Sequence, residues 1–181
     1  MARNYVNTMF SEAARHLQAI DGSRESYARM EMGGDGSPDP IGERERDFIE
    51  ARDSFYLASI TPDGWPYIQH RGGPPGFLRA LGGNRIGFAD YRGNRQHLSN
   101  ANIGHEPRVS LFLMDYPNRR RLKLIGHAAI TDDPALVEAL MPAGYAALPE
   151  RAYLIDVLGF DWNCPQHITP RFTEAEVRQR G

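Results

Sequence analysis

The clearest candidate for binding chemistry is the stretch FADYRGNRQHLSN, residues 88–100, in which a strand-like run meets a basic turn and then a helix-like run. The first amides of a helix attract anions, and Gly93 would let a ligand approach the backbone closely. Asn94 can donate an amide hydrogen bond, and Arg95 or Arg92 can hold phosphate oxygens. This elbow predicts a site for a terminal phosphate. The alternative is that Asn94 only caps the helix and both arginines are solvated.

A second candidate is IQHRGGPPGF, residues 68–77, where a strand ends in three polar residues and a rigid corner follows. The polar residues are Gln69, His70 and Arg71. The corner begins at Gly72 and presents backbone amides with little side-chain bulk, so a flat ring could lie against it. The alternative interpretation is a tight turn between two strands.

A third candidate is the run DYPNRRRLK, residues 115–123, at the start of a strand. Arg119 and Arg121 would lie on the same strand face as Lys123, while Leu122 and Leu124 would face the core. Such a basic stripe suits a phosphate or an electron-rich ring edge. It is also typical of a solvated surface or of a nucleic-acid patch.

A fourth candidate is the proline-containing tail, residues 162–171, which holds several polar and aromatic residues: Trp162, Cys164, Gln166, His167 and Arg171. Ordered loops with this composition often carry function. Cys164 and His167 would be a nucleophile and a base, but the pair lacks an orienting acid. The histidines do not fall at metal-ligand spacing with a carboxylate or cysteine, so no metal site is expected; a haem ligand stays possible.

Hydrophobic spacing predicts the elements that must position these residues. Helices are expected at 10–20 and 41–52, after the elbow to about 103, and at 134–141. Strands are expected at 54–60, 65–71, 77–81, 85–90, 108–114, 121–130 and 152–160, with an irregular tail after them. Because most of these strands form hairpins, the pattern predicts a mainly β fold with peripheral helices and a closed or nearly closed antiparallel barrel.

The composition limits the class of protein. The chain has 181 residues, enough for one domain, and 21 basic against 23 acidic residues, a balance that argues against a nucleic-acid partner. One cysteine excludes an intrachain disulfide framework, and no segment is apolar enough to cross a membrane or to serve as a signal peptide. We therefore expect a cytoplasmic protein with no membrane partner. Residues 1–47 are expected to form a helical extension and linker, and residues 48–181 the domain with its tail.

Four blocks together resemble a known family: GWPYIQHRGGPPGFL, FADYRGNRQ, DYPNRRRLKLIG and WNCPQHITPR. Their order and spacing are similar to those of the pyridoxamine 5'-phosphate oxidase-like, FMN-binding split-barrel family, in particular its predicted flavin-nucleotide-binding branch. The resemblance implies a six-stranded antiparallel split β-barrel that forms a homodimer, with FMN bound between the subunits.

The resemblance also implies which residues bind FMN. Gln69, His70, Arg71 and the adjoining Gly72 would lie beside the flavin, and Asp90, Tyr91, Asn94 and Arg95 would hold the ribityl phosphate. Asn118, Arg119 and Arg121 would reach the flavin of the partner chain, and Trp162, Gln166 and His167 would lie near its ring.

The chain also departs from the true oxidase. It has Asn94 and Arg95 where the oxidase has an arginine and a lysine, and QHITPR does not reproduce the substrate-binding pattern of the oxidase. We therefore expect an FMN-dependent oxidoreductase acting on an unidentified small molecule. The alternative is a non-enzymatic module that stores, senses or delivers flavin or haem. Catalytic residues are not assigned.

Overall fold

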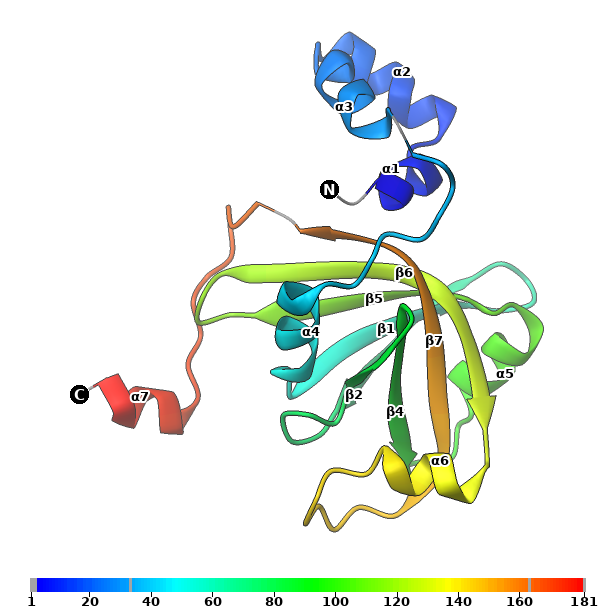
Figure 1. Cartoon of the computed structure of the whole chain (residues 1–181), viewed down its shortest axis with the longest axis vertical. Helices are drawn as coiled ribbons and strands as arrows, with labels where there is room; N and C mark the ends of the chain where they lie inside the picture. The colour runs from blue at the N-terminus through cyan, green and yellow to red at the C-terminus, as the bar shows by residue number, and fades with distance from the viewer. Residues whose placement is uncertain (1–2, 33, 163, 181) are drawn as a thin grey trace.

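The computed structural model describes residues 3–32, 34–162 and 164–180. One antiparallel sheet dominates it, with the strand order β2-β1-β5-β6-β7-β4-β3 (Figure 1). The strands are β1 Ser54–Ile60, β2 Pro66–Gly72, β3 Arg79–Gly82, β4 Arg85–Tyr91, β5 Arg108–Asp115, β6 Arg120–Thr131 and β7 Pro149–Trp162.

The sheet curves into a barrel that stays open, because the edge strands β2 and β3 do not pair with each other among the described strands. The expected mainly β, split-barrel fold is confirmed, whereas the expectation of a closed or nearly closed barrel is wrong. The sheet has seven strands, as the hydrophobic spacing predicted, and not the six that the resemblance implied, because the run around Arg79 forms the short strand β3 beside β4. The segment between Gly72 and Arg79 connects the two edge strands, β2 and β3, and contributes no strand of its own to the sheet.

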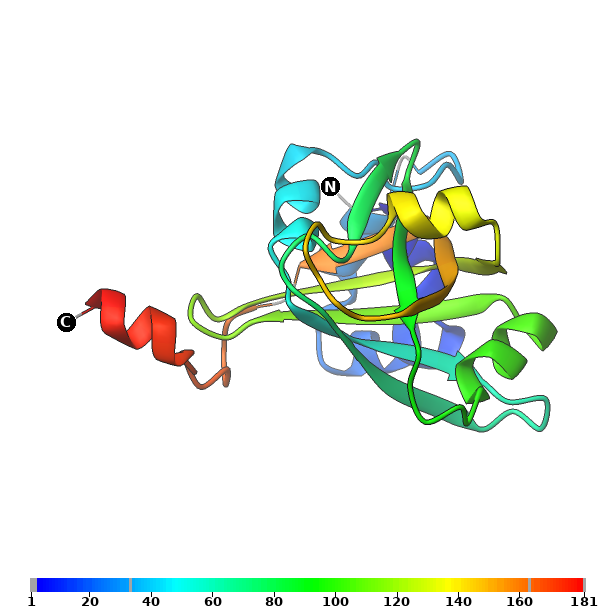
Figure 2. The same cartoon turned by 90° about the horizontal axis from the view of Figure 1, so that it is seen from below.

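Helices lie around the sheet: α1 Arg3–Met9, α2 Glu12–Ile20, α3 Arg24–Glu31, α4 Glu43–Glu50, α5 Leu98–His105, α6 Pro134–Ala139 and α7 Glu174–Arg180. The sequence did not predict α1, α3 or α7. The tail contains α7, which projects away from the barrel in Figure 2. The start of α7 carries a threonine–glutamate capping box, in which Thr173 and Glu176 exchange hydrogen bonds.

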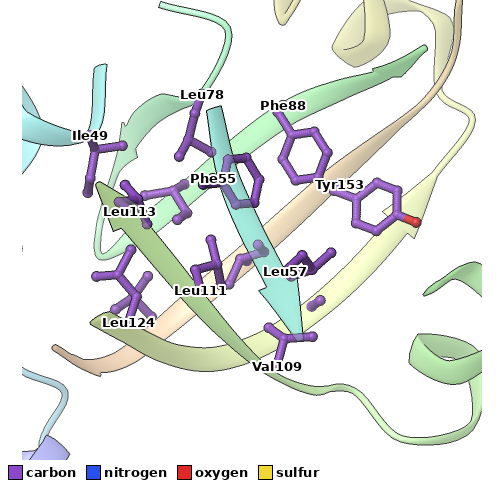
Figure 3. Close-up of a cluster of buried hydrophobic side chains, with 14 of the residues drawn as sticks. Ile49, Phe55, Leu57, Leu78, Phe88, Val109, Leu111, Leu113, Leu124 and Tyr153 are labelled. Atoms are coloured by element: carbon purple, nitrogen blue, oxygen red, sulfur yellow. The ribbon is translucent and has the colours of Figure 1, made fainter. Parts of the chain in front are cut away.

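The core lies inside the curved sheet (Figure 3). Phe55 and Leu57 on β1, with Leu111 and Leu113 on β5, are almost completely buried, as the alternating pattern of these strands predicts. Phe88 stacks on Tyr153 with their ring centroids 4.8 Å apart. This stack brings β4 and β7 together at the end of the barrel where the elbow begins.

A β-bulge in the β6–β7 ladder changes which side chains of β7 face the core. The register shifts between Ile125 and Gly126, so Tyr153 and Val157 are buried on one side of the bulge and Phe160 on the other. A Cβ atom at Gly126 would overlap the carbonyl group of Asp156. The bulge therefore requires glycine at position 126, and it determines which side chains of β7 face the core.

The N-terminal helices are attached to the barrel through Asp39, which is buried. Its carboxylate accepts hydrogen bonds from the backbone amides of Asn4 at 2.8 Å, Tyr5 at 2.9 Å and Phe160 at 3.4 Å. The domain division at residue 47 stays a prediction; α4 crosses it and contributes Phe48 to the core. Within the described residues, no helix has the length and apolar character needed to span a membrane.

Candidate functional site

A small pocket lies where β2, the elbow after β4 and the start of β7 meet. It has a volume of about 50 Å³. It is lined by part of the predicted site: Gln69, Arg71, Asp90, Tyr91, Asn94 and Arg95. A cavity needs about 10–15 Å³ of such volume to hold one water molecule, and small-molecule sites usually exceed about 300 Å³. The pocket therefore suits a phosphate-sized group and cannot enclose a ring system.

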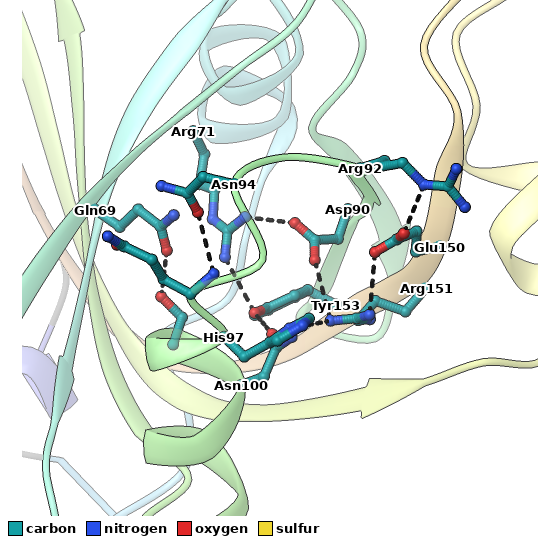
Figure 4. A network of polar contacts seen from close by, with 12 residues as sticks. Gln69, Arg71, Asp90, Arg92, Asn94, His97, Asn100, Glu150, Arg151 and Tyr153 are labelled. Carbon is teal, nitrogen blue, oxygen red and sulfur yellow. Dashed lines mark hydrogen bonds and ion pairs between the residues drawn. The ribbon is translucent and has the colours of Figure 1, made fainter.

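Arg71, on β2, is the most constrained side chain of this pocket (Figure 4). Its guanidinium forms an ion pair with Asp90 and donates a hydrogen bond to the hydroxyl of Tyr153 at 3.0 Å. The guanidinium also lies 4.9 Å from the centre of the Tyr153 ring. Its Nε is buried and has no hydrogen-bond partner among the described residues. Arg71 therefore has a donor to offer to a ligand.

Tyr153 helps to position Arg71, because its hydroxyl accepts a hydrogen bond from the guanidinium group. Its side chain is fully buried, and its hydroxyl donates a hydrogen bond to the side-chain oxygen of Asn100 on α5. Burial raises the pKa of Tyr153 to about 12, and Arg71 opposes that rise. The hydroxyl is therefore protonated at neutral pH and links the strand that carries Arg71 to the helix after the elbow.

Tyr153→Phe is expected to lower the free energy of unfolding by about 1–3 kcal/mol, because Asn100 and Arg71 each lose their hydrogen bond with the buried Tyr153 hydroxyl. Urea denaturation of the ligand-free protein measures this change. Tyr145→Phe, at a half-exposed ring that packs against Tyr91, is the matched control and should change stability by less than about 0.5 kcal/mol. Equal stability of the two variants would contradict the supporting role of Tyr153.

A second arginine reaches the pocket from β7. Arg151 lies 3.7 Å from Asp90 and donates a hydrogen bond to Glu150 at 3.2 Å. Arg92 donates another to Glu150 at 2.9 Å, and this bond holds the pKa of Glu150 below its usual range. With Arg71 and Arg95, three arginines line the pocket together with the carboxylates of Asp90 and Glu150, so the formal charge of the lining is +1. Arg92 pairs with Glu150 from outside the lining.

The elbow joins β4 to α5 as predicted, but Asn94 does not cap the helix. Its side-chain oxygen accepts a hydrogen bond from the amide of Gln96 at 3.2 Å. The N-cap position is His97, which has a φ of 56° and makes no side-chain capping bond in the described part of the chain. Arg95 also has a positive φ, 58°, which is uncommon for arginine. Such backbone geometry often occurs at binding sites.

Gln69 joins β2 to the helix start, where its side-chain oxygen accepts a hydrogen bond from Ser99 at 2.6 Å. His70, the next residue, points to the other side of the strand and packs against Tyr56 with ring centroids 5.8 Å apart. Gly72 ends β2 beside the His70 ring. The structure therefore brings Gln69 and Arg71 to the pocket and leaves His70 and Gly72 outside it.

The other predicted residues lie around the β5–β6 turn and the tail, away from α5 (Figures 1 and 2). Asn118 donates to Asp115, and Trp162 packs on Phe48 and donates to Glu45. Arg119 and Arg121 flank the start of β6, and Gln166 and His167 are exposed in the tail. These residues do not reach the pocket of their own chain. Their proposed role toward a partner chain stays a prediction.

One residue of the basic stripe expected on β6 is already paired with an acidic side chain of the same chain. Lys123 forms an ion pair with Asp161 at 3.0 Å and lies 5.1 Å from the centre of the Tyr5 ring. Leu122 and Leu124 are fully buried, as expected from the strand alternation. Where the structure describes the chain, no group of three histidine, cysteine or acidic side chains could hold a metal ion.

The residues around the pocket that the sequence analysis missed include Asn100, Glu150, Arg151 and Tyr153. The alternation of Arg151 and Tyr153 along β7 placed them on one face, which was a usable signal. However, that face reaches the pocket only because β7 pairs with β4, with Arg151 opposite Asp90. The sequence did not indicate this pairing.

Comparison with known proteins agrees with this fold. The model of the family described as pyridoxamine 5'-phosphate oxidase matches residues 41–159. HupZ of group A Streptococcus is 16% identical, with a TM-score of 0.54 over 74% of this chain and 100% of that one. An FMN-binding protein of Syntrophomonas wolfei is 9% identical, with a TM-score of 0.51 over 81% and 97%.

A candidate pyridoxamine 5'-phosphate oxidase from Lactobacillus delbrueckii is 16% identical, with a TM-score of 0.52 over 66% of this chain and 92% of that chain. No curated protein matches the sequence significantly. At these identities, the similarity to the solved structures concerns the fold.

Proposed function

Since the chain belongs to the pyridoxamine 5'-phosphate oxidase family, we propose that it binds FMN with the ribityl phosphate in the elbow pocket, and that it is an oxidoreductase acting on a small molecule. The observation that carries the proposal is the arrangement of three arginines around two carboxylates in a phosphate-sized pocket at the start of α5. A phosphate monoester carries a charge of about −1.5 to −2 at neutral pH, and the net positive lining of the pocket attracts it.

The residues present fit the phosphate end of FMN. The Nε of Arg71 is buried without a partner among the described residues, and Arg95 is exposed on the elbow. The first hydrogen bond of α5 runs from the amide of Ala101 to the carbonyl of His97, so the amides of 98–100 precede it and can donate to an anion. Arg71, Arg95 and the helix start would hold the phosphate from three sides.

The flavin ring has to lie outside the elbow pocket, because the pocket is too small for it. The predicted ring-binding residues Asn118, Arg119 and Arg121 lie toward the other end of the sheet, with Trp162, Gln166 and His167. A homodimer that pairs the elbow of one chain with the β5–β6 turn of its partner would complete the site. Two such sites would form per dimer.

The outer face of β1 and β2 provides a surface for this dimer. Tyr56 and Ile60 on β1 and Ile68 on β2 are exposed, and Ile68 retains 66% of its accessible surface. Trp65, in the turn between these strands, retains 73%. Contiguous exposed apolar residues on a sheet are typical of an interface.

Bound flavin would supply the electron transfer, and the protein would bind and orient it. Asp90 holds Arg71 and Arg151 in place, and Tyr153 fixes the orientation of Arg71. These contacts keep the guanidinium groups positioned before the ligand arrives.

The direct test is the visible absorption spectrum of the protein purified without added cofactor, followed by chromatography of the molecule released by heat. We expect FMN at about one copy per chain. A colourless protein that does not take up added FMN, or one that releases haem, would contradict the proposal. Turnover with reduced nicotinamides and common acceptors then separates an enzyme from a storage or delivery module.

Arg95→Ala is expected to weaken FMN binding by about 1.5–3 kcal/mol, because a hydrogen bond to a charged group contributes that much. This corresponds to a dissociation constant higher by about 10- to 150-fold, measured by quenching of flavin fluorescence. Arg108→Ala is the matched control, since Arg108 is an exposed arginine paired with Glu106 on β5. Unchanged FMN affinity in Arg95→Ala would contradict the placement of the phosphate in the elbow pocket.

Ile68→Asp is expected to convert the dimer to a monomer, because it places a charge in the centre of the apolar face of β1 and β2. Light scattering coupled to size-exclusion chromatography measures the mass. Ile20→Asp on α2 is the matched control, because Ile20 is equally exposed, at 67% against 66% for Ile68. A dimer that persists in Ile68→Asp would exclude this face as the interface.

A further inference from the structure

A second hollow adjoins the elbow pocket. It is a groove of about 620 Å³ between α5 and the last part of β6. Asn100 and Arg151 line both the groove and the elbow pocket, so the two hollows adjoin at these two residues. The groove has the volume of a typical small-molecule site, whereas the pocket has room only for a phosphate-sized group. A ligand anchored in the pocket can therefore extend into the groove.

The two ends of the groove differ in polarity. Thr131 and Asp132 lie at the end of β6 next to the start of β7, where Thr131 pairs with Ala152 and Arg151 precedes it. Asn100 lies in the first half of α5 and accepts a hydrogen bond from Tyr153 near the start of β7. Charged and hydrogen-bonding groups therefore surround the junction with the elbow pocket.

The far end of the groove is apolar and has little side-chain bulk. Ala128 lies beside the end of α5, because its amide donates a hydrogen bond to the carbonyl of Pro107, just after the helix. Ile103 and Gly104 form the helix wall there. A Cβ atom at Gly104 would meet none of the described atoms within 4 Å. Small residues on both walls leave room for a flat ring between them.

We infer that this groove accommodates the adenosine half of a flavin dinucleotide, with the phosphate next to the ribityl chain in the elbow pocket and the second phosphate beside Arg151. The inference rests on the proposed flavin site and extends its ligand range from FMN to FAD. A diphosphate needs a second cation next to the first site, and Arg151 lines both hollows. Asp132 can accept a hydrogen bond from a ribose hydroxyl, and the apolar end can cover the adenine ring.

Titration calorimetry of the cofactor-free protein with FMN and with FAD tests this inference. We expect the wild-type chain to bind FAD within about tenfold of its affinity for FMN, a difference of about 1.4 kcal/mol. Gly104→Phe places a ring at the wall of the groove, where the added Cβ atom meets none of the described atoms within 4 Å. It is expected to weaken FAD binding by about tenfold or more and FMN binding by less than about twofold. Asp132→Ala is expected to act in the same direction, with a smaller effect.

Ala101→Phe is the matched control, because it adds the same ring to an exposed position of α5 that does not line the groove. It should change neither affinity. Wild-type protein that binds FMN and rejects FAD would overturn the inference and leave the proposed function intact. Equal loss of both affinities in Gly104→Phe, or no loss of either, would also overturn it. Failure to bind any flavin would overturn the proposed function itself.

Discussion

Arg71→Ala is expected to abolish retention of FMN during purification and to lower the free energy of unfolding of the ligand-free protein by about 3 kcal/mol. The side chains of Arg71 and Asp90 retain only 14% and 10% of their accessible surface. Removal of the guanidinium leaves the Asp90 carboxylate with Arg151 alone, at 3.7 Å. Leaving one partner of a buried ion pair uncompensated is among the costliest single changes in a protein.

Two measurements separate the binding effect of Arg71 from its structural effect. Urea denaturation without cofactor gives the stability change, and FMN titration at a temperature where the variant is folded gives the affinity change. Arg71→Lys keeps the charge and loses the forked geometry, so it should recover most of the stability and little of the affinity. The double variant Arg71→Ala with Asp90→Asn should be more stable than Arg71→Ala, because it also removes the unpaired charge.

An Arg71→Ala protein that retains FMN at one copy per chain would contradict the assignment of the phosphate to this pocket. An Arg71→Ala protein as stable as wild type would contradict the energetic role of the ion pair with Asp90. Each result concerns a separate claim, because the first depends on the ligand and the second does not.

Gly126→Ala is expected to lower the free energy of unfolding by about 3 kcal/mol or more, because the added Cβ overlaps backbone of the facing strand. The atoms it would meet belong to Asp156 and Val157 on β7, and backbone in a ladder cannot move aside as a flexible side chain can. The melting temperature should fall by about 6–12 °C, the shift typical of a domain of this size.

The matched control for this variant is Gly104→Ala on α5, where an added Cβ meets none of the described atoms within 4 Å. That change should leave stability unaltered or raise it by up to about 1 kcal/mol, because alanine favours a helix over glycine. If the Gly126→Ala and Gly104→Ala proteins had the same melting temperature, the bulge would tolerate a side chain, contrary to this prediction.

The Gly126 variant also bears on the binding site. If β7 slipped by one residue to relieve the overlap, Arg151 and Tyr153 would turn to the opposite face of the sheet. Folded Gly126→Ala protein is therefore expected to bind FMN more weakly, even though Gly126 lies outside the pocket. Fluorescence quenching by the folded fraction measures this loss.

The resemblance in the sequence was enough to predict the family and the split-barrel fold, because the strand runs and the four motif blocks are local features of the chain. The elbow motif also identified residues that line one pocket, namely Asp90, Tyr91, Asn94 and Arg95, since these residues are neighbours along the chain. By contrast, the alternative that Asn94 caps α5 is wrong. The N-cap residue of α5 is His97, which has a left-handed backbone conformation.

The sequence by itself determined the alternation of Phe55 and Leu57 in β1, the turn after it and the basic elbow, because each depends on residues only a few positions apart. Only the tertiary structure decided that Arg151 lies opposite Asp90, that Tyr153 supports Arg71, and that the barrel stays open between β2 and β3. The pairing of β4 with β7 joins segments about sixty residues apart. Its register follows from packing the whole core around Phe88 and Tyr153 and from the bulge at Gly126, and no local spacing encodes that packing.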